Sequence, residues 1–389
     1  MKVLVLAPYR VFPAVDGPSN RVKELSLSLS ELGASVTLLH AGEAGFREGR
    51  LRVVGYTAFE SHPYTRGFVW SRGLDAYLSP WNPHLCGAVL RAIRRVKPDV
   101  LQIEGPWGVL TAELARRRSR DLAVVYDAHN VEALAARFSS MVPSAWPYVM
   151  FLEGRAVELS DAVLCVSELD KTRMCGLYSA PSSRITVAPN GVSVGRYRRD
   201  SGDMIRRRLG LGADTRIVFF HGLLRWRPNL EAAHVIVESL APRFEADDVV
   251  FLVAGAHPPR ALLEAAGRRS NVRVLGYVEA IEDYVCAADV CVAPMKSGAG
   301  TKLKILEYLA AGKPVVATRR AVEGMGVRDG VEAMVYNDDG EEFVGGLRRC
   351  LMGLAPSGLG ESAWAYAGRF DWTKIAERVL KVYDSLASP

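Results

Sequence analysis

The chain has 389 residues, of which 49% are hydrophobic and 24% are charged. These proportions exclude a mostly disordered, collagen-like or coiled-coil chain. The length predicts two domains, because a single core stops growing at about 250–300 residues. The formal net charge is only +6, which argues against a dedicated nucleic-acid-binding protein.

Cysteine spacing and the N-terminus bear on the cellular compartment. The six cysteines form no C-x-x-C pair, so neither a zinc ribbon nor a thioredoxin-like site is indicated. Several lie in apolar runs that suit free thiols, and we expect no disulfides. The N-terminal apolar run ends at Pro8, too early for a signal peptide, and no stretch reaches the ~20 apolar residues of a bilayer span. We therefore expect a cytoplasmic protein, at most attached peripherally to the inner face of a membrane.

Short Val/Leu-rich runs alternate with segments of helical period through the first half of the chain. A helix is predicted at 21–33, with Gly33 as its stop. The strands predicted before and after it lie at 3–8, 36–41, 99–104, 123–129, 162–167 and 185–190. They are apolar at nearly every residue, as expected where helices cover both faces of a sheet. This β-α-β order predicts a doubly wound parallel sheet.

A polar segment at 192–215 interrupts this rhythm, which then restarts. The second half has a predicted helix at 301–312 and strands at 216–222, 249–255, 271–277, 289–295 and 314–318. It is therefore expected to form a second α/β domain with the same architecture. The aromatic C-terminal segment is predicted to be helical and is expected to pack on the first domain.

The resulting division has two Rossmann-like domains facing a cleft. The first covers residues 1–195 and is completed by a C-terminal helix at about 366–389, and the second covers residues 196–365. Ligands of such sheets bind beyond the carboxyl ends of the strands, so functional residues are expected just after strands.

The strongest motif is SGAGTKLKILEYLAAGKPVVAT at 297–318. It places a loop of small residues between a predicted strand and the helix that Thr301 opens. Glycines allow a ligand to approach the backbone closely, and the first N–H groups of a helix bind anions. Lys302 adds a charge suited to phosphate, and Glu307 could accept hydrogen bonds from a ribose diol. These groups describe a nucleoside diphosphate site, although a solvated turn would also fit the residues alone.

This stretch resembles the donor-binding signature of the GT-B glycosyltransferases, especially glycosyltransferase family 4. Further segments also resemble the family and occur in its order along the chain, from residue 1 to about 340. They are DGPSNR, YDAHNVE, VAPNGV, FHGLLRWRPN and LGYVEAIEDYVCAADVCVAP. The resemblance implies a retaining, metal-independent hexosyltransferase without a cofactor. It implies that the second domain binds a UDP or GDP sugar and that the first binds the acceptor, which would be a glycan, a lipid-linked sugar or a small molecule.

His129 is the candidate catalytic residue of the first domain, beside Lys302 and Glu307 of the second. It ends a predicted strand, where Asp127 could tune it. The resemblance implies contact with the donor sugar beside the anomeric carbon, whereas an isolated histidine after a strand is more often structural. The full candidate donor set is Gly17, Arg225, Arg227, His257, Val278, Gly298, Gly300, Thr301, Lys302, Leu303 and Glu307.

Several of these donor positions also have a purely structural interpretation. Gly17 lies in the first turn between strand and helix, where a diphosphate could bind, but a tight turn would also need it. Its neighbour Arg21 could be solvated. Arg225 and Arg227 could meet the diphosphate, with Arg227 slightly preferred, or could be surface residues. His257 is expected near the nucleobase.

The sequence indicates the residues that bind the acceptor less clearly than those that bind the donor. Glu104 could orient an acceptor hydroxyl or take its proton, and Trp107 follows it closely. Further aromatic residues suit sugar stacking or lipid contact, among them Trp70, Tyr77, Trp81, Trp146, Tyr148 and Phe151. Basic clusters at 91–97 and 116–120 could bind anionic lipids or form solvated helix faces. Asn190 and Gly191 are expected to form a hinge turn.

One departure from the family pattern concerns the donor sugar, and two other functions stay open. Many family members carry a glutamate eight positions before Glu307, where this chain has Ala299. The donor sugar is therefore undetermined. A nucleotide-sugar epimerase of the same fold, or a catalytically weak protein that binds sugar nucleotides, remain alternatives.

Overall fold

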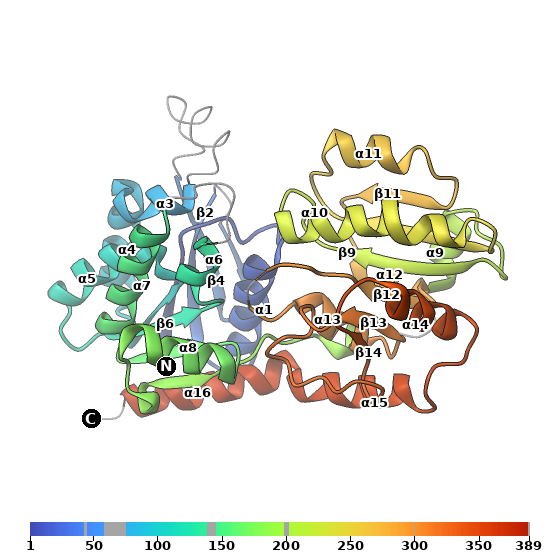
Figure 1. Ribbon diagram of the computed structural model, residues 1–389. Helices are drawn as coiled ribbons and strands as arrows, with labels where there is room; N and C mark the ends of the chain where they lie inside the picture. Colours follow the sequence, from blue (N-terminus) through green and yellow to red (C-terminus); the bar gives the residue numbers. More distant parts are fainter. Residues whose placement is uncertain (43–44, 58–74, 138–144, 198–201, 299, 388–389) are drawn as a thin grey trace. The chain divides into compact units, whose positions relative to one another are not determined.

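A computed structural model describes residues 1–42, 45–57, 75–137, 145–197, 202–298 and 300–387 of the chain (Figure 1). The chain forms two compact units. The first comprises Met1–Asn190 and Trp372–Pro389, and the second comprises Gly191–Asp371. The sequence analysis places the divisions at 195/196 and 365/366.

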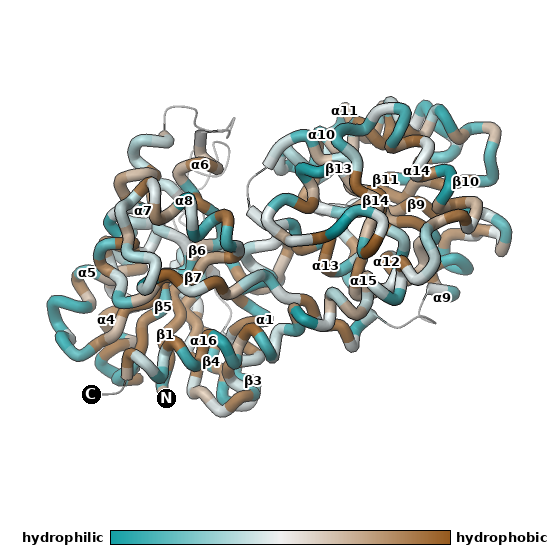
Figure 2. The backbone as a smooth tube through the Cα atoms, turned by 60° about the horizontal axis from the view of Figure 1, so that its bottom comes forward, coloured by the Kyte–Doolittle hydropathy of each residue, from teal (hydrophilic) through white to brown (hydrophobic). Residues whose placement is uncertain are grey.

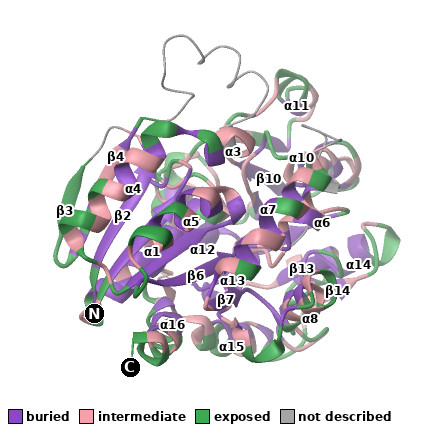
Figure 3. Ribbon diagram, turned by 90° about the vertical axis from the view of Figure 1, so that its left-hand side faces the viewer, coloured by how far each residue is buried: buried purple, intermediate pink, exposed green. Residues whose placement is uncertain are grey.

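The first unit is built on an eight-stranded sheet in the order β3-β4-β2-β1-β5-β6-β7-β8. Each neighbouring pair is parallel, apart from the antiparallel pair β3 and β4. The strands are β1 Lys2–Ala7, β2 Ser35–Ala41, β3 Phe46–Glu48, β4 Leu51–Tyr56, β5 Val100–Glu104, β6 Ala123–Ala128, β7 Ala162–Cys165 and β8 Ile185–Val187. The edge strand β3 is exposed, whereas β2, β6 and β7 are buried (Figure 3).

Helices cover this sheet, as its apolar strands require. They are α1 Gly17–Glu31, α3 Asp75–Leu78, α4 Pro83–Val96, α5 Val109–Arg118, α6 Glu132–Arg137, α7 Trp146–Leu159, α8 Glu168–Tyr178 and α16 Trp372–Ala387. Short 3₁₀ turns η2 Ser79–Trp81 and η3 Pro106–Gly108 connect some of them. The C-terminal helix α16 packs against α1, near the start of the chain (Figure 1).

The second unit has a six-stranded, wholly parallel sheet in the order β11-β10-β9-β12-β13-β14. Its strands are β9 Arg216–His221, β10 Val249–Ala254, β11 Val272–Gly276, β12 Val290–Ala293, β13 Val315–Thr318 and β14 Met334–Tyr336. Its α-helices are α9 Gly202–Arg208, α10 Arg227–His234, α11 Arg260–Ala266, α12 Ile281–Ala287, α13 Leu303–Ala310, α14 Glu341–Leu351 and α15 Leu359–Ala367. The predicted pair of doubly wound parallel sheets is therefore confirmed.

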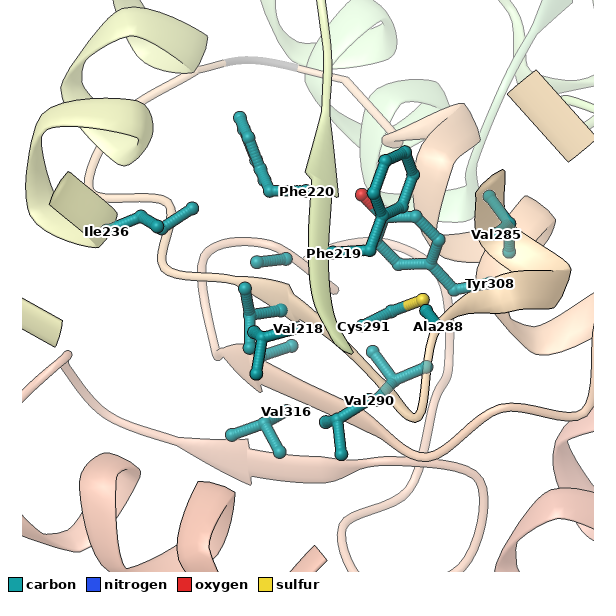
Figure 4. Close-up of a cluster of buried hydrophobic side chains, with 14 of the residues drawn as sticks. Val218, Phe219, Phe220, Ile236, Val285, Ala288, Val290, Cys291, Tyr308 and Val316 are labelled. Carbon is teal, nitrogen blue, oxygen red and sulfur yellow. The ribbon is translucent and has the colours of Figure 1, made fainter. Parts of the chain in front are cut away.

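Apolar residues concentrate along the strands in both units (Figure 2). In the second unit the side chains of β9 alternate across the sheet. Phe219 faces Tyr308 of α13 on one side, while Phe220 points to the other side (Figure 4). Both phenylalanines are fully buried. This alternation fixes which neighbours the next two positions, His221 and Gly222, can reach at the carboxyl end of the strand.

The ends of β9 and β10 approach each other too closely for side chains. A Cβ atom added to Gly255 would lie 1.9 Å from the carbonyl oxygen of Gly222. A Cβ atom added to Gly222 would lie 2.7 Å from both the Asn229 amide and the Lys304 ammonium group. Glycine is therefore required at position 255 by contact with backbone, whereas a larger residue at position 222 would have to displace the Asn229 and Lys304 side chains.

Two further expectations can be compared with the structure. All six cysteines are free. None of the described helices combines the length and the apolarity that a bilayer span requires.

Candidate active site

A buried cluster of charges lies at the carboxyl ends of β5 and β6. Glu104 and Asp127 are register partners on these strands, and both are fully buried. Arg21 of α1 donates hydrogen bonds from Nε and Nη2 to the two oxygens of Asp127, at 3.0 and 2.8 Å. Its other N–H groups reach acceptors in the segment 188–190. Arg21 is 1% exposed, so the alternative that it is solvated is wrong.

His129 directly follows β6 and joins this cluster. Its Nε2 atom lies 2.7 Å from Glu104 Oε2 and 4.0 Å from Asp127 Oδ2. Burial alone would lower the pKa of His129, but the Glu104 hydrogen bond and the charges of Asp127 and Glu104 outweigh it and raise the pKa. Among the described residues Nδ1 has no hydrogen-bond partner, so it is the ring nitrogen left for a ligand.

A chain of buried hydrogen bonds runs from Glu104 to the C-terminal helix. The Tyr383 hydroxyl donates to Gln102 Oε1, and Gln102 Nε2 donates to Glu104 Oε1. The Glu104 carboxylate thus accepts from both Gln102 and His129, which favours its ionised form. Burial and the charge of Asp127 act the other way and raise the pKa of Glu104. Sequence reasoning missed Gln102, although its spacing of two from Glu104 on a strand places both on one face.

Tyr9, just beyond β1, flanks His129. The two rings meet edge to face, with their centroids 6.4 Å apart. The Tyr9 hydroxyl is buried and has no hydrogen-bond partner among the described residues. Burial and the nearby Glu104 raise the pKa of Tyr9, so its oxygen carries a proton. Because an unpaired buried hydroxyl is costly, it suits contact with a ligand oxygen.

In the second unit the SGAG loop joins β12 to α13 at the corresponding edge of the sheet. Gly298 and Gly300 have φ angles of 114° and 64°, values that favour glycine. Ala299 lies outside the described residues. Lys302 is the N-cap of α13, and its ammonium group donates to the Gly300 carbonyl at 2.6 Å. Thr301 and Leu303 flank this lysine, Leu303 as the first helical residue.

Glu307 lies on α13 beside the end of β9. Its Oε2 atom is 2.9 Å from His221 Nε2, and the two side chains are 11% and 14% exposed. That histidine nitrogen is itself buried, and no described residue gives it a hydrogen bond of good geometry. The carboxylate that the sequence assigns to a ribose diol therefore adjoins an incompletely satisfied imidazole, which sequence reasoning missed.

Lys304 is a second lysine of α13 that the predicted set omits. Its Nζ atom lies 2.7 Å from Asn229 Oδ1 and 4.2 Å from the centre of the Phe220 ring. Burial lowers the pKa of Lys304 to about 7, with the charge of Glu307 acting in the opposite direction. A signal for it exists in the sequence, since residues three apart on a helix share a face. Lys304 and Glu307 have this spacing.

The other predicted donor residues lie in loops that follow neighbouring strands. Arg225 and Arg227 are exposed, and Arg227 pairs with Glu231 at 2.7 Å. Glu231 also accepts a hydrogen bond from Ser297 of the SGAG loop. His257 is exposed after β10, and Val278 is half-buried after β11, packed on the core. These positions follow the carboxyl ends of β9, β10 and β11 and therefore share one edge of the sheet.

Comparison with known families decides the assignment. Residues 15–196 match the model described as Glycosyltransferase Family 4, and residues 215–352 match Glycosyl transferases group 1. This chain belongs to these glycosyltransferases. The family inferred from the motifs is confirmed, and the two models match the two units separately.

Individual relatives are distant. The D-inositol 3-phosphate glycosyltransferase of Acidothermus cellulolyticus is 28% identical over 78% of this glycosyltransferase and 72% of its own length. The protein of the same name from Actinosynnema mirum is 28% identical over 59% of each chain, less than two thirds of that relative.

Solved structures support the GT-B fold. Sucrose-phosphate synthase from Thermosynechococcus elongatus has a TM-score of 0.81 at 17% identity over 99% of both chains. Anabaena Alr3699/HepE, in its complex with UDP-glucose, has a TM-score of 0.71 at 18% identity over 99% of this chain and 100% of its own.

In this glycosyltransferase Glu104, Asp127 and His129 bring three possible metal-ligand atoms within 4.8 Å of one another. Hydrogen bonds already occupy them, because both Asp127 oxygens accept from Arg21 and both Glu104 oxygens accept from side chains. A metal ion here would have to displace the Arg21 guanidinium. The donor set is therefore better described as two carboxylates that accept hydrogen bonds from Arg21, Gln102 and His129.

The remaining predicted residues of the glycosyltransferase lie in its first unit. Gly17 begins α1, and the preceding Asp16 accepts a hydrogen bond from the Ser19 backbone at 2.9 Å. That carboxylate already occupies the helix N-terminus, where an anion would otherwise bind. Trp107 lies in η3 and packs edge to face on Tyr77.

The predicted aromatic positions differ in exposure. Trp81, Trp146 and Phe151 are exposed on η2 and α7. Trp70 lies outside the described residues.

Proposed function

We propose that this glycosyltransferase moves a hexose from a nucleoside diphosphate sugar to an acceptor hydroxyl, with retention at the anomeric carbon and without a metal ion. The observation that carries the proposal is the arrangement on α13. Its first turns bring two ammonium groups and the Glu307 carboxylate to the carboxyl edge of a parallel sheet, the edge where such folds bind nucleotides.

Charge complementarity supports the donor class. A diphosphate leaving group develops negative charge, which a fixed cation such as Lys302 and the N–H groups at the start of α13 would stabilise. The Glu307 carboxylate accepts hydrogen bonds and suits a ribose diol. The solved structure of Anabaena Alr3699/HepE contains UDP-glucose, which supports a sugar nucleotide as the donor class.

In the first unit His129 is proposed to contact the transferred sugar. With Nε2 bonded to Glu104, a protonated ring presents its Nδ1–H as a hydrogen-bond donor. The neighbouring carboxylates stabilise this form, because their charges raise the pKa of His129. The unpaired Tyr9 hydroxyl is available to the same ligand. Retention is what the family implies. The acceptor class and peripheral membrane attachment stay predictions from the sequence.

The test uses two variants of α13. Lys302→Ala and Glu307→Ala are each expected to lower transfer by about 10²–10³-fold, as loss of a fixed electrostatic contact does. Transfer is measured as release of UDP or GDP from a panel of sugar nucleotides with candidate acceptors, and the melting temperature reports folding. Lys313→Ala, near the other end of the helix, is the matched control and should retain activity.

Near-normal turnover in both variants would remove the assignment. Product analysis without acceptor distinguishes the alternatives from the original prediction. An epimerase would convert the donor sugar, and a protein that only binds would bind the donor yet leave it intact.

A further inference from the structure

The Lys304 ammonium group is buried without a counter-ion. Lys304 is 8% exposed, and no residue that the structure describes forms an ion pair with it. Its contacts are a neutral amide oxygen of Asn229 and the face of Phe220. An ammonium group has three donors and needs acceptors for each. A buried cation in such surroundings is costly unless an anion completes the site.

Groups from β9 and α10 hold the ammonium group in place. Gly222 lies directly beside the ammonium group, since an added Cβ would come within 2.7 Å of Nζ. Asn229 belongs to the first turn of α10, and its amide nitrogen is held by the Leu223 carbonyl at 3.1 Å. The Asn229 oxygen is thereby directed at Lys304. The lysine is therefore fixed in place by neutral groups from β9 and α10.

We propose that Lys304 binds the diphosphate of the sugar nucleotide and takes up a proton when the donor binds. This inference rests on the proposed function and adds to it a second cation, distinct from Lys302. Lys304 also replaces Arg227 as the second cation expected at the diphosphate, because Arg227 is already paired with Glu231 on the surface.

Proton uptake follows from the charges around Lys304. On its own helix Glu307 favours the charged lysine and Lys302 disfavours it, while burial is the largest effect and lowers the pKa to about 7. From β9 His221 lies beside Glu307, and α10 contributes the exposed pair Arg227 and Glu231. Above neutral pH the free protein therefore holds a largely neutral Lys304. A bound diphosphate favours the ammonium form and recruits the proton.

The experiment measures binding of UDP-glucose and GDP-glucose by titration calorimetry from about pH 6.5 to 8.5. Their diphosphates are diesters, so they do not themselves titrate in this range. Buffers of different ionisation enthalpy report the protons taken up. For the wild type we expect uptake of up to one proton above neutral pH and an affinity that falls by up to about tenfold per pH unit.

Lys304→Met is the decisive variant. It should weaken binding by about 10–100-fold at pH 6.5, as loss of a charge-assisted contact does, and should abolish both the proton uptake and its share of the pH dependence. Lys313→Met removes the same charge near the far end of α13 and should change neither quantity.

Thermal unfolding separates this role from a structural one. Because folding lowers the pKa of Lys304 to about 7, its charge opposes folding most strongly at and below about pH 7, and this penalty fades as the pH rises toward the ordinary lysine value. Lys304→Met should therefore melt at the same temperature as the wild type or higher, whereas a structural lysine would leave a less stable protein.

Equal affinity and equal proton uptake in Lys304→Met and wild type would overturn this inference and leave the proposed function intact. Failure of the wild type to bind any sugar nucleotide would overturn both.

Discussion

The environment of Arg21 differs from the one that its local sequence suggests. In DGPSNR it resembles any arginine in the first turn of a helix, yet it is buried and bonded to both oxygens of Asp127. Asp127 lies 106 residues away in the chain. No periodicity in α1 predicts this contact, because the partner is set by the sheet order. The same holds for Lys304, whose partner Asn229 comes from another helix.

Arg21→Ala should lower the free energy of unfolding by about 3–5 kcal/mol, because Asp127 would stay buried without its partner. Urea unfolding measured by circular dichroism checks this. Arg225→Ala, at an exposed arginine, is the control and should change the same quantity by less than about 0.5 kcal/mol. Equal losses in the two variants would contradict a buried ion pair at Arg21.

At the scale of elements, the N-terminus of α6 is capped by a side chain of the neighbouring helix α7. Glu153 of α7 is fully buried and accepts hydrogen bonds from the backbone N–H groups of Glu132 and Ala133. Its two oxygens also accept from the hydroxyl groups of Tyr126 and Tyr178. Because α6 follows the loop that carries His129, this carboxylate fixes where that loop ends.

The same carboxylate makes stability depend on pH. Burial raises the pKa of Glu153 to about 7, so between its ordinary value and about 7 the folded protein holds a proton that the unfolded chain has released. Its contribution to stability therefore falls as pH rises through this window, by up to about 3 kcal/mol. Glu153→Gln should show a shallower fall. Urea unfolding at about pH 5 and pH 7.5 measures both slopes, and identical slopes would refute the assignment.

The elements themselves were largely predictable. Strands such as Val249–Ala254 are apolar throughout and flanked by helical periods, so the parallel sheets followed from the sequence. Strand Phe46–Glu48 was missed because it is short and exposed. The loops after the strands were located correctly along the chain, but which side chains pair within them depends on strand order. That is why Gln102, His221 and Lys304 were not proposed from sequence.

At the scale of the whole molecule, the chain returns to its first unit at the end. Helix α16 buries Trp372, Ile375, Val379 and Tyr383, and the hydroxyl of Tyr383 begins the hydrogen-bond chain to Glu104. The partner Gln102 is 281 positions away. The buried face of α16 is therefore part of the first unit's core.

Deletion of residues 372–389 should unfold the first unit, because α16 contributes fully buried side chains to it. Loss of a cooperative melting transition, or insolubility on expression, is the expected result. Tyr383→Phe keeps the ring and removes only the hydroxyl, so it should fold with a loss of about 1 kcal/mol. A truncated chain that melts like the wild type would show that α16 is dispensable.

The close approach of the chain at Gly222 and Gly255, at the ends of β9 and β10, limits how donor preference can be redesigned. A side chain at Gly255 would collide with the backbone carbonyl of Gly222, and one at Gly222 would have to displace the side chains of Asn229 and Lys304, so changing either glycine would disturb the site itself. Libraries that aim to switch the donor should therefore leave both glycines fixed and randomise the exposed positions around them, such as Arg225 and His257.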